Sequence, residues 1–218
     1  MNIAILGASG AIGREVTALA LARGHQVIAL VRKPESLRAS VLLKVVRADV
    51  ADSSSIQRGL EGAEVVISVL GLRKGDMPVT LTNAARLLSV SGVPRVVWLG
   101  SFGIGATRRA IGPVGPLLRF LLRREADEKA AADEQVAASG GSVVHSPGFS
   151  GKPATGQFRL VSVEAVRSRI FPPMIPRADV AALLLGEAET PQFAGRISVA
   201  QRAADMLAER SPAGTRAL

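Results

Sequence analysis

Cysteine and tyrosine are both absent from the 218 residues, and histidine occurs only twice. Without cysteine, the chain has no disulfide framework, no thiolate nucleophile and no cysteine-ligated metal site. Without tyrosine, no phenol group acts as an acid or a base anywhere in the chain. His25 lies in a Gly-His-Gln turn before an apolar run, so we expect it to be structural. The sequence predicts no metal site.

Aromatic residues are also scarce, at 3% of the chain, although the formal net charge is +9. So few aromatics cannot form a platform on which bases stack. The basic residues are spread along the chain without a run of five or more, which argues against a nucleic-acid surface. No apolar run is long enough to span a membrane, and the first residues lack the basic start of a secretion signal. We therefore expect a cytoplasmic globular protein.

The most informative pattern is the turn Gly7-Ala8-Ser9-Gly10-Ala11-Ile12-Gly13. It joins an apolar run at 3–6, which predicts a buried strand, to a helical pattern at 14–23. Glycines at this junction allow a tight turn, close approach of a ligand and close packing of the helix. The helix N-terminus then offers free N–H groups to a phosphate. The turn therefore predicts dinucleotide binding, and the plain alternative is an ordinary strand–helix connection. The expected cofactor contacts are Gly7, Ser9, Gly10, Ala11, Ile12 and Gly13.

Strand and helix patterns continue to alternate along the chain. Further strands are predicted at 26–31, 43–48, 63–70, 95–99 and 142–145, and helices at 53–60, 80–90, 116–138 and 177–185. This alternation predicts an α/β fold with a Rossmann-type, doubly wound parallel sheet in the order 3-2-1-4-5-6. We expect one NAD(P)-binding domain over residues 1–218.

The second half of the chain is less regular. A small substrate-side region is expected at about 150–200, with short strands near 158–163, 169–170 and 195–199, followed by a tail at 201–218 that holds one further helix. The stretch at 106–118 is rich in Gly, Pro and Arg and predicts a mobile substrate-side loop. The amphipathic segment 117–124 could lie on a membrane surface, but packing on the sheet or against the pocket is favoured.

The end of the second strand bears on the choice of cofactor. An NAD site usually places Asp or Glu there, to hold the ribose hydroxyls. This chain has Arg32 and Lys33 instead, and two cations suit the 2′-phosphate of NADP. The alternative is a pair of surface cations without a ligand.

Other strand ends face the same edge, where open α/β sheets bind their ligands. Asp49 could accept a hydrogen bond from the adenine amino group or could only form a turn, and Val50 offers backbone atoms. Gly71, beside Leu70, allows close approach of the cofactor. Ser101 follows the fifth strand. The sixth strand leads to the remaining predicted contacts, Pro147, Gly148 and Phe149.

These segments resemble atypical short-chain dehydrogenase/reductase proteins with an NmrA-like or flavin-reductase-like pattern. The resemblance covers roughly residues 1–200. It rests on the glycine turn, Val31-Arg32-Lys33-Pro34, Ala48-Asp49-Val50, Leu99-Gly100-Ser101, Lys129 with Asp133-Glu134 and Ser139-Gly140, and Ile175-Pro176-Arg177-Ala178-Asp179-Val180-Ala181. Two positions depart from the family. Glu125 stands where relatives with a Tyr-x-x-x-Lys pair have tyrosine, and Ser146-Pro147 replaces a frequent Arg-Pro.

The resemblance implies an NADP(H)-binding oxidoreductase. A flavin, a quinone or a similar conjugated small-molecule acceptor needs no tyrosine, because its proton can come from water. Ser101 is the candidate pocket hydroxyl, or equally a loop-capping residue. Lys129 either reaches the cofactor ribose or pairs with Asp133 one helical turn on.

Two other functions fit the same sequence. The first is a non-catalytic NADP(H)-sensing regulator that acts through a protein partner. The second, weaker one is a sugar-nucleotide or isoflavone-type enzyme, for which the C-terminal part leaves little room. The sequence leaves open whether the chain forms a homo-oligomer.

Overall fold

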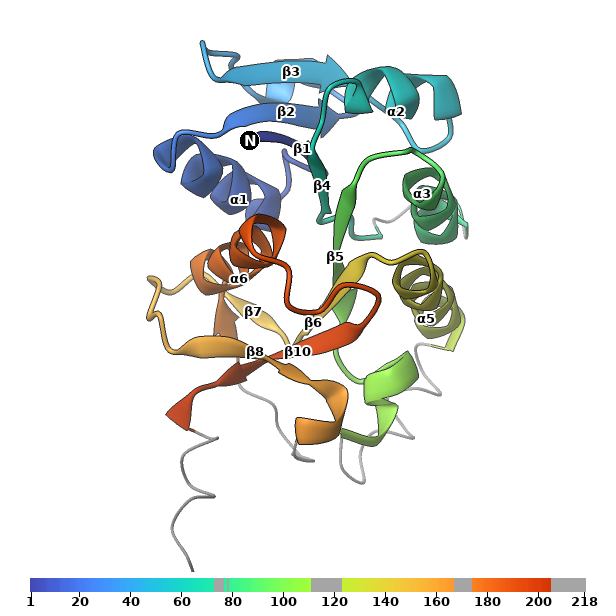
Figure 1. The fold of residues 1–218 in the computed structure, drawn as a ribbon, viewed down its shortest axis with the longest axis vertical. Helices are drawn as coiled ribbons and strands as arrows, with labels where there is room; N and C mark the ends of the chain where they lie inside the picture. The colour runs from blue at the N-terminus through green and yellow to red at the C-terminus, as the bar shows by residue number, and fades with distance from the viewer. Residues whose placement is uncertain (73–76, 78, 111–122, 167–173, 205–218) are drawn as a thin grey trace, which may run out of the picture.

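The computed structural model describes residues 1–72, 77, 79–110, 123–166 and 174–204, without the side chains of residues 123 and 124. At its centre lies an eight-stranded sheet in the order β3-β2-β1-β4-β5-β6-β10-β8 (Figure 1). The strands are β1 Asn2–Leu6, β2 Gln26–Val31, β3 Leu43–Arg47, β4 Val65–Ser68, β5 Arg95–Ser101, β6 Ser142–Ser146, β8 Phe158–Ser162 and β10 Ile197–Arg202.

The first six strands are parallel, so the predicted order 3-2-1-4-5-6 is confirmed. Two later strands extend the sheet. β10 pairs parallel with β6, and β8 pairs antiparallel with β10. The parallel strands all end at one edge of the sheet, which we call the carboxyl edge, and begin at the opposite one, the amino edge.

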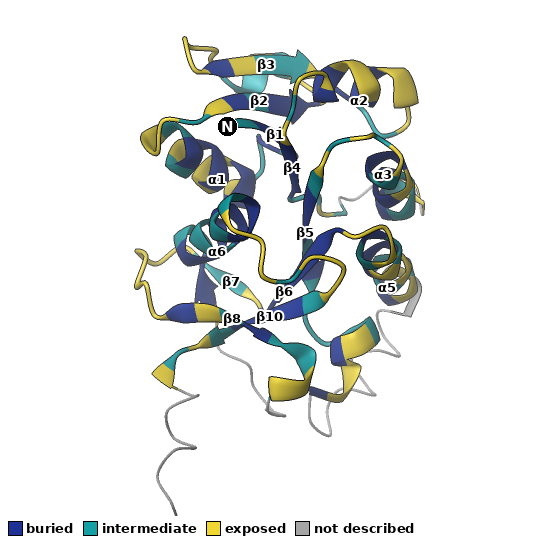
Figure 2. Cartoon of the chain, in the orientation of Figure 1, coloured by how far each residue is buried: buried dark blue, intermediate teal, exposed yellow. Residues whose placement is uncertain are grey.

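Helices cover both faces of the sheet (Figure 1). On one face lie α1 (Ala11–Ala22) and α6 (Arg177–Glu189), and on the other lie α2 (Ser53–Leu60), α3 (Thr80–Ser89) and α5 (Arg123–Ala138). Each face has its own apolar core, which packs the buried sides of these helices against Val, Ile and Leu of the strands. Figure 2 shows the central strands β1, β4 and β6 almost wholly buried between the two helical layers, whereas the outer strands β3 and β8 are partly exposed. The central sheet is therefore the rigid frame from which the strand ends project.

Several segments differ from the sequence-based expectation. β5 continues to Ser101, and residues 201 and 202 belong to β10 instead of a tail. A second, two-stranded sheet pairs β7 (Phe149–Ser150) with β9 (Ile175–Pro176), and neither strand was predicted. Short 3-10 helices form at η1 (Pro34–Ser36), η2 (Gly105–Ala110) and η3 (Val163–Ala165).

The expected mobile loop at 106–118 is wrong for its first part, because η2 buries Thr107 and Ala110. Its remainder, the first part of the predicted helix at 116–138, the strand at 169–170 and the tail helix lie outside the described residues. Of the helices that the structure describes, none is long and apolar enough to cross a bilayer.

Candidate functional site

The glycine turn connects the carboxyl end of β1 to α1. Gly7 has a φ of +90°, a conformation that side chains with a Cβ rarely adopt. A Cβ on Gly13 would lie 2.3 Å from the Gly7 carbonyl oxygen and 2.7 Å from Ala8 Cα. Both neighbours are backbone atoms, so Gly13 lets α1 pack directly on the turn.

Gly10 has a different environment from Gly13. A Cβ there would meet only the Gly7 carbonyl oxygen, at 3.2 Å. Gly10 is the N-cap of α1, and no side chain caps this helix. The first N–H groups of a helix have no acceptor within it. The start of α1 therefore offers donors and a positive dipole end at the carboxyl edge, in the arrangement that binds phosphate.

The end of β2 lies beside this turn. Arg32 and Lys33 are both exposed there and precede η1. Arg14, in the first turn of α1, donates from Nε to the Ser9 carbonyl and from Nη2 to the Ser36 carbonyl, each at 3.1 Å. Arg14 thus ties the glycine turn to the segment that follows the two cations. The sequence analysis did not single out Arg14, and its only signal was a cation directly after the third glycine.

The next two strand ends carry Asp49, Val50, Leu70 and Gly71. The Asp49 carboxylate accepts a hydrogen bond from the Ala51 N–H at 3.0 Å, so it forms the turn that the sequence left as one alternative. The Val50 carbonyl already accepts from the Asn83 side chain at 3.2 Å. Gly71 is exposed, and a Cβ there would have no heavy atom within 4 Å. Open space therefore lies beside the end of β4.

Two serines end the neighbouring strands β5 and β6. Ser101 and Ser146 are register partners in this parallel pair. Side chains alternate along a strand, so Ser101 shares a face with Leu99, and Ser146 shares one with Val144. Both apolar residues belong to the core beneath α1 and α6, and the two serine side chains therefore point to the same face. Ser101 is half-buried, whereas Ser146 is 4% exposed and its hydroxyl has no partner among the described residues.

Beyond Ser146, the chain runs through Pro147, Gly148 and Phe149 into β7. The Gly148 carbonyl accepts from the Ile175 N–H at 2.9 Å, which joins this segment to β9. Met174 is 57% exposed, and its Sδ would lie 2.5 Å from a Cβ on Gly148. An accessible thioether therefore covers the predicted contact segment. The sequence analysis missed Met174 because a single methionine outside any periodic pattern gives no signal.

Lys129 does not pair with Asp133. Its Nζ lies 3.7 Å from Glu125 Oε2, one helical turn back along α5. Asp133 is instead buried and binds Trp98 and His145. The residue that stands in the family's tyrosine position is thus the ion-pair partner of the lysine. No contact in the described residues joins Lys129 to the glycine turn.

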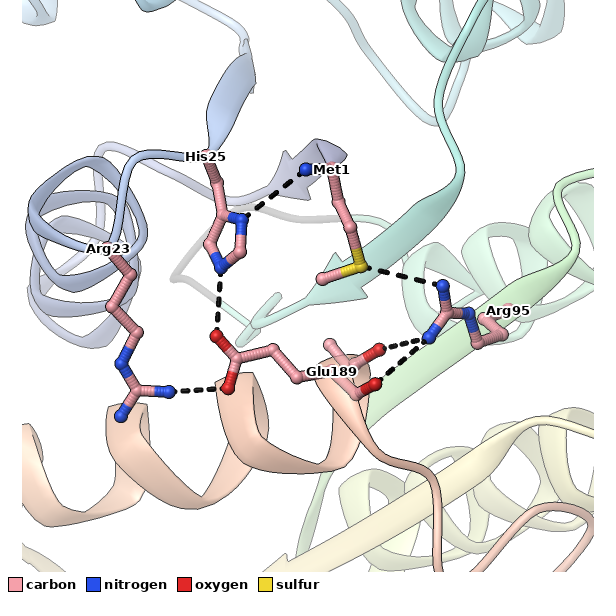
Figure 3. Close-up of polar contacts among 6 residues, drawn as sticks. Met1, Arg23, His25, Arg95 and Glu189 are labelled. Carbon is pink, nitrogen blue, oxygen red and sulfur yellow. Dashed lines mark hydrogen bonds and ion pairs between the residues drawn. The ribbon is translucent and has the colours of Figure 1, made fainter.

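His25, which the sequence predicts to be structural, lies at the amino edge (Figure 3). His25 Nε2 is 2.8 Å from Glu189 Oε1, and Arg23 Nη1 is 2.5 Å from Glu189 Oε2. Arg95, the first residue of β5, donates to the Ala188 carbonyl at 2.6 Å, so this cluster ties the end of α6 to α1 and the sheet. Its place at the edge opposite the glycine turn agrees with a structural role for His25.

These residues fit a nicotinamide dinucleotide. The turn supplies the glycine cradle and the free helix N-terminus, and the two exposed cations stand beside it. The buried, unpartnered Ser146 hydroxyl lies at the same edge and is a group that needs a hydrogen-bond partner. Within the described part of the chain, no group of three or more His, Asp or Glu is placed to hold a metal ion.

Solved structures of other proteins share this fold. An oxidoreductase from Lactococcus lactis superposes with a TM-score of 0.76 at 18% identity, and the match covers 99% of this chain and 100% of that one. An anaerobillin reductase from Escherichia coli O157:H7 gives a TM-score of 0.75 at 20% identity, with 98% and 100% covered. At these identities the likeness shows the fold alone.

A curated relative, an uncharacterized protein of Mycobacterium tuberculosis, is 31% identical over 105 residues. That match covers 46% of this chain but only 12% of the relative, so the chain spans a small part of that protein's length. The model of the NAD(P)H-binding family matches residues 7–191, from the first glycine of the turn to the residue two positions beyond α6. The chain therefore belongs to the NAD(P)H-binding family.

Proposed function

We propose that this protein is an NADP(H)-dependent reductase whose acceptor is a flavin, a quinone or a similar conjugated small molecule, and which works without a catalytic tyrosine. The observation that carries the proposal is the content of the carboxyl edge. A phosphate cradle, two exposed cations and a pair of neighbouring serines all end strands of one sheet. The chain contains no tyrosine to serve as an acid or a base.

Each group has a defined task in this proposal. The N–H groups at the start of α1 bind the pyrophosphate, and Arg32 with Lys33 binds the 2′-phosphate. Ser101 and Ser146 donate hydrogen bonds to polar groups of the nicotinamide and the acceptor. The bound cofactor supplies a hydride. The described parts of the substrate-side region, residues 150–166 and 174–200, include Met174, and they cover the acceptor and keep water away from it.

The proposal of a conjugated acceptor rests on the absence of tyrosine from the chain. A reduced isolated carbonyl carries a strongly basic oxygen, which needs a well-placed acid such as tyrosine. A conjugated ring spreads the added charge over several atoms, so water or a weak donor such as a serine hydroxyl suffices. The likeness to an anaerobillin reductase supports this proposal, since its fold is shared over 98% of the chain.

The first experiment measures which cofactor binds. Arg can bind a phosphate with two parallel N–H bonds, each worth about 1.5–3 kcal/mol, and exposure and salt reduce that gain. We expect NADPH to bind about tenfold to a thousandfold more tightly than NADH at low salt, with the preference shrinking as salt rises. Arg32→Ala removes most of the preference, and Lys33→Ala removes less, because lysine binds as a point charge.

Lys44→Ala is the matched control. Lys44 is also exposed, and its replacement by alanine removes one positive charge, as Arg32→Ala and Lys33→Ala do. Lys44 lies within β3, however, and not at the end of a strand. It should leave the preference nearly unchanged. Equal affinities for NADPH and NADH in the wild type would contradict the assignment of NADP. A preference that survives in Arg32→Ala would move the 2′-phosphate to other residues.

The second experiment measures NADPH oxidation with a panel of free flavins and quinones. Turnover with at least one acceptor supports the reductase. Tight NADPH binding with no turnover across the panel would instead favour a regulator that senses NADP(H) and acts through a protein partner. Light scattering with and without NADPH then tests whether binding changes self-association.

A further inference from the structure

Four buried side chains form one continuous hydrogen-bonded series on the α5 face of the sheet. Trp98 Nε1 donates to Asp133 Oδ1 at 2.9 Å, Asp133 Oδ2 lies 2.8 Å from His145 Nε2, and His145 Nδ1 lies 2.9 Å from Thr107 Oγ1. None of the four is more than 2% exposed. They come from β5, α5, β6 and η2, so the series joins four elements. We call it the Trp98–Thr107 network.

The polar atoms of this network are satisfied together. The Asp133 carboxylate has two oxygens, and each accepts from a different ring N–H. His145 Nε2 faces Asp133, and the other ring nitrogen, Nδ1, faces the Thr107 hydroxyl, which also lies 3.0 Å from the Ile104 carbonyl oxygen. Loss of any one member would therefore leave a buried polar atom without its partner.

The network ends at the loop that follows Ser101. Thr107 Oγ1 accepts a hydrogen bond from the Gly103 N–H at 2.9 Å, and Gly103 has a φ of +90°. The Phe102 N–H donates to the Ser146 carbonyl at 3.2 Å. The two residues directly after Ser101 are thus each held by one hydrogen bond. One of those bonds comes from the network, and the other comes from the end of β6.

The same network also fixes the residue before Ser101. A Cβ on Gly100 would lie 2.6 Å from His145 Cδ2 and 2.9 Å from Asp133 Oδ1. Gly100 therefore lets the Asp133–His145 pair pack directly on the backbone of β5. Ser101 points to the opposite face of the sheet, so the pair contacts the strand beneath it and not its side chain.

We propose that Asp133, His145 and Thr107 are positioning residues for the proposed reductase site. They hold the backbone on both sides of Ser101, through Gly100 on one side and Gly103 on the other, and thereby fix where its hydroxyl lies at the carboxyl edge. They do not touch the cofactor or the acceptor. This proposal rests on the proposed function, in which the Ser101 hydroxyl faces the reacting groups.

The other end of β6 provides a control of similar burial. Glu187 is 3% exposed and accepts hydrogen bonds from the Ser142 hydroxyl at 2.7 Å and the Phe193 N–H at 2.8 Å. This cluster lies at the amino edge, since Ser142 begins β6. Glu187→Gln therefore perturbs a buried hydrogen-bonded carboxylate of the same sheet without touching the Ser101 segment.

The central test compares Thr107→Val with Thr107→Ser. Valine keeps the shape but removes the hydroxyl that binds Gly103 and His145, whereas serine retains it. We expect Thr107→Val to lower kcat by about tenfold to a hundredfold, because a displacement of about 1 Å at a reacting group has an effect of that size. The Kd for NADPH should change less than about threefold, since the phosphate cradle lies on other strands. Thr107→Ser should restore kcat.

His145→Gln is the second variant, for the case that Thr107→Val does not fold. The glutamine amide can still reach Asp133 but no longer reaches Thr107. It should lower kcat as Thr107→Val does. Glu187→Gln should lower the melting temperature while leaving kcat close to the wild-type value. If Thr107→Val and Glu187→Gln both keep wild-type kcat, or if both lose it equally, the positioning role is overturned.

Two further readouts separate this proposal from the proposed function. Trp98 is the only tryptophan of the chain, so its emission reports on the network directly. Hydrogen exchange measured by mass spectrometry reports on the amides of residues 101–105. Thr107→Val should speed exchange in that segment and shift the Trp98 emission, and Glu187→Gln should do neither. A wild type that binds no NADPH refutes the proposed function, whereas unchanged exchange in Thr107→Val refutes the positioning role even if NADPH binds and turns over.

Discussion

Gly10→Asp should separate cofactor binding from folding. Asp is among the best N-cap residues, and its charge is favourable at a helix N-terminus, so the substitution should stabilise α1 by a few tenths of a kcal/mol. A Cβ at this position meets only one atom within 4 Å, the Gly7 carbonyl oxygen at 3.2 Å. This contact is tight and the Gly7 carbonyl must move by a few tenths of an ångström, which offsets the gain from capping. We therefore expect the fold to tolerate the change and the melting temperature to stay close to the wild-type value.

The same carboxylate should prevent NADPH binding. A capping side chain accepts from the N–H groups at the start of α1, which are the groups proposed to bind the pyrophosphate. Two like charges about 4 Å apart repel by about 4 kcal/mol at an effective dielectric constant near 20. This corresponds to roughly a thousandfold loss of affinity, since each 1.4 kcal/mol is a factor of ten. The loss should shrink as salt rises.

Gly10→Asn is the matched control for this experiment. Asn caps a helix about as well as Asp and has nearly the same shape, but it carries no charge. Calorimetric titration with NADPH, together with thermal melting, compares the wild type with both variants. The Asp variant should bind far more weakly than the Asn variant while melting at a similar temperature. Equal NADPH affinity in the two folded variants would refute a pyrophosphate at this turn.

Three further outcomes follow from the structure. Ser101→Ala should lower turnover by about tenfold to a hundredfold with little change in the Kd for NADPH. Wild-type kinetics in this variant, under conditions where hydride transfer limits the rate, would contradict a role for the Ser101 hydroxyl. Gly13→Ala should lower the melting temperature by about 2–12 °C, because its methyl group meets backbone atoms that cannot rotate away. An unchanged melting temperature would show that the turn can relax. Hydrogen bonds from the Ser54 hydroxyl and the Ser55 N–H hold the pKa of Asp52 below its ordinary value. The stability that Asp52 contributes at neutral pH should therefore disappear as the pH falls through that lowered pKa, and thermal melts of wild type and Asp52→Asn should converge in acid.

Much of the fold was predictable because local patterns fix it. Apolar runs and helical periodicities alternate along the first 146 residues, and right-handed crossovers leave few ways to order the strands. The unpredicted elements are those without such a pattern. β7 and β9 have two residues each, and each residue pairs with one that lies 26 positions away along the chain, Phe149 with Ile175 and Ser150 with Pro176. β5 continues through Gly100 because that glycine packs beneath His145, a contact that no local pattern encodes.

The candidate site also has one part that the sequence predicts and one part that it does not. The glycine turn could be located from the sequence, because its spacing reflects steric needs within seven consecutive residues. The expected pairing of Lys129 with Asp133 is wrong, and the sequence could not favour Glu125, because both acids lie one helical turn away from the lysine. Burial decides between them: Asp133 is 2% exposed and belongs to the network on β5, whereas the Glu125 side chain is 58% exposed and available to a surface lysine. Such a choice requires knowing which side of α5 faces the sheet.

The two edges of the sheet use their polar side chains differently. At the amino edge, His25, Glu189 and Glu187 all have protein partners (Figure 3). At the carboxyl edge, the buried hydroxyls of Ser68 and Ser146 have none among the described residues. A buried hydroxyl without a partner destabilises a folded protein by about 1–3 kcal/mol. Under the proposed function, these two hydroxyls lie next to the fully bonded Trp98–Thr107 network and would receive their missing partners from the bound ligand. The hydroxyls that the proposal leaves for a ligand therefore end strands of the parallel sheet, whereas His25 precedes β2, and Glu187 and Glu189 lie on α6.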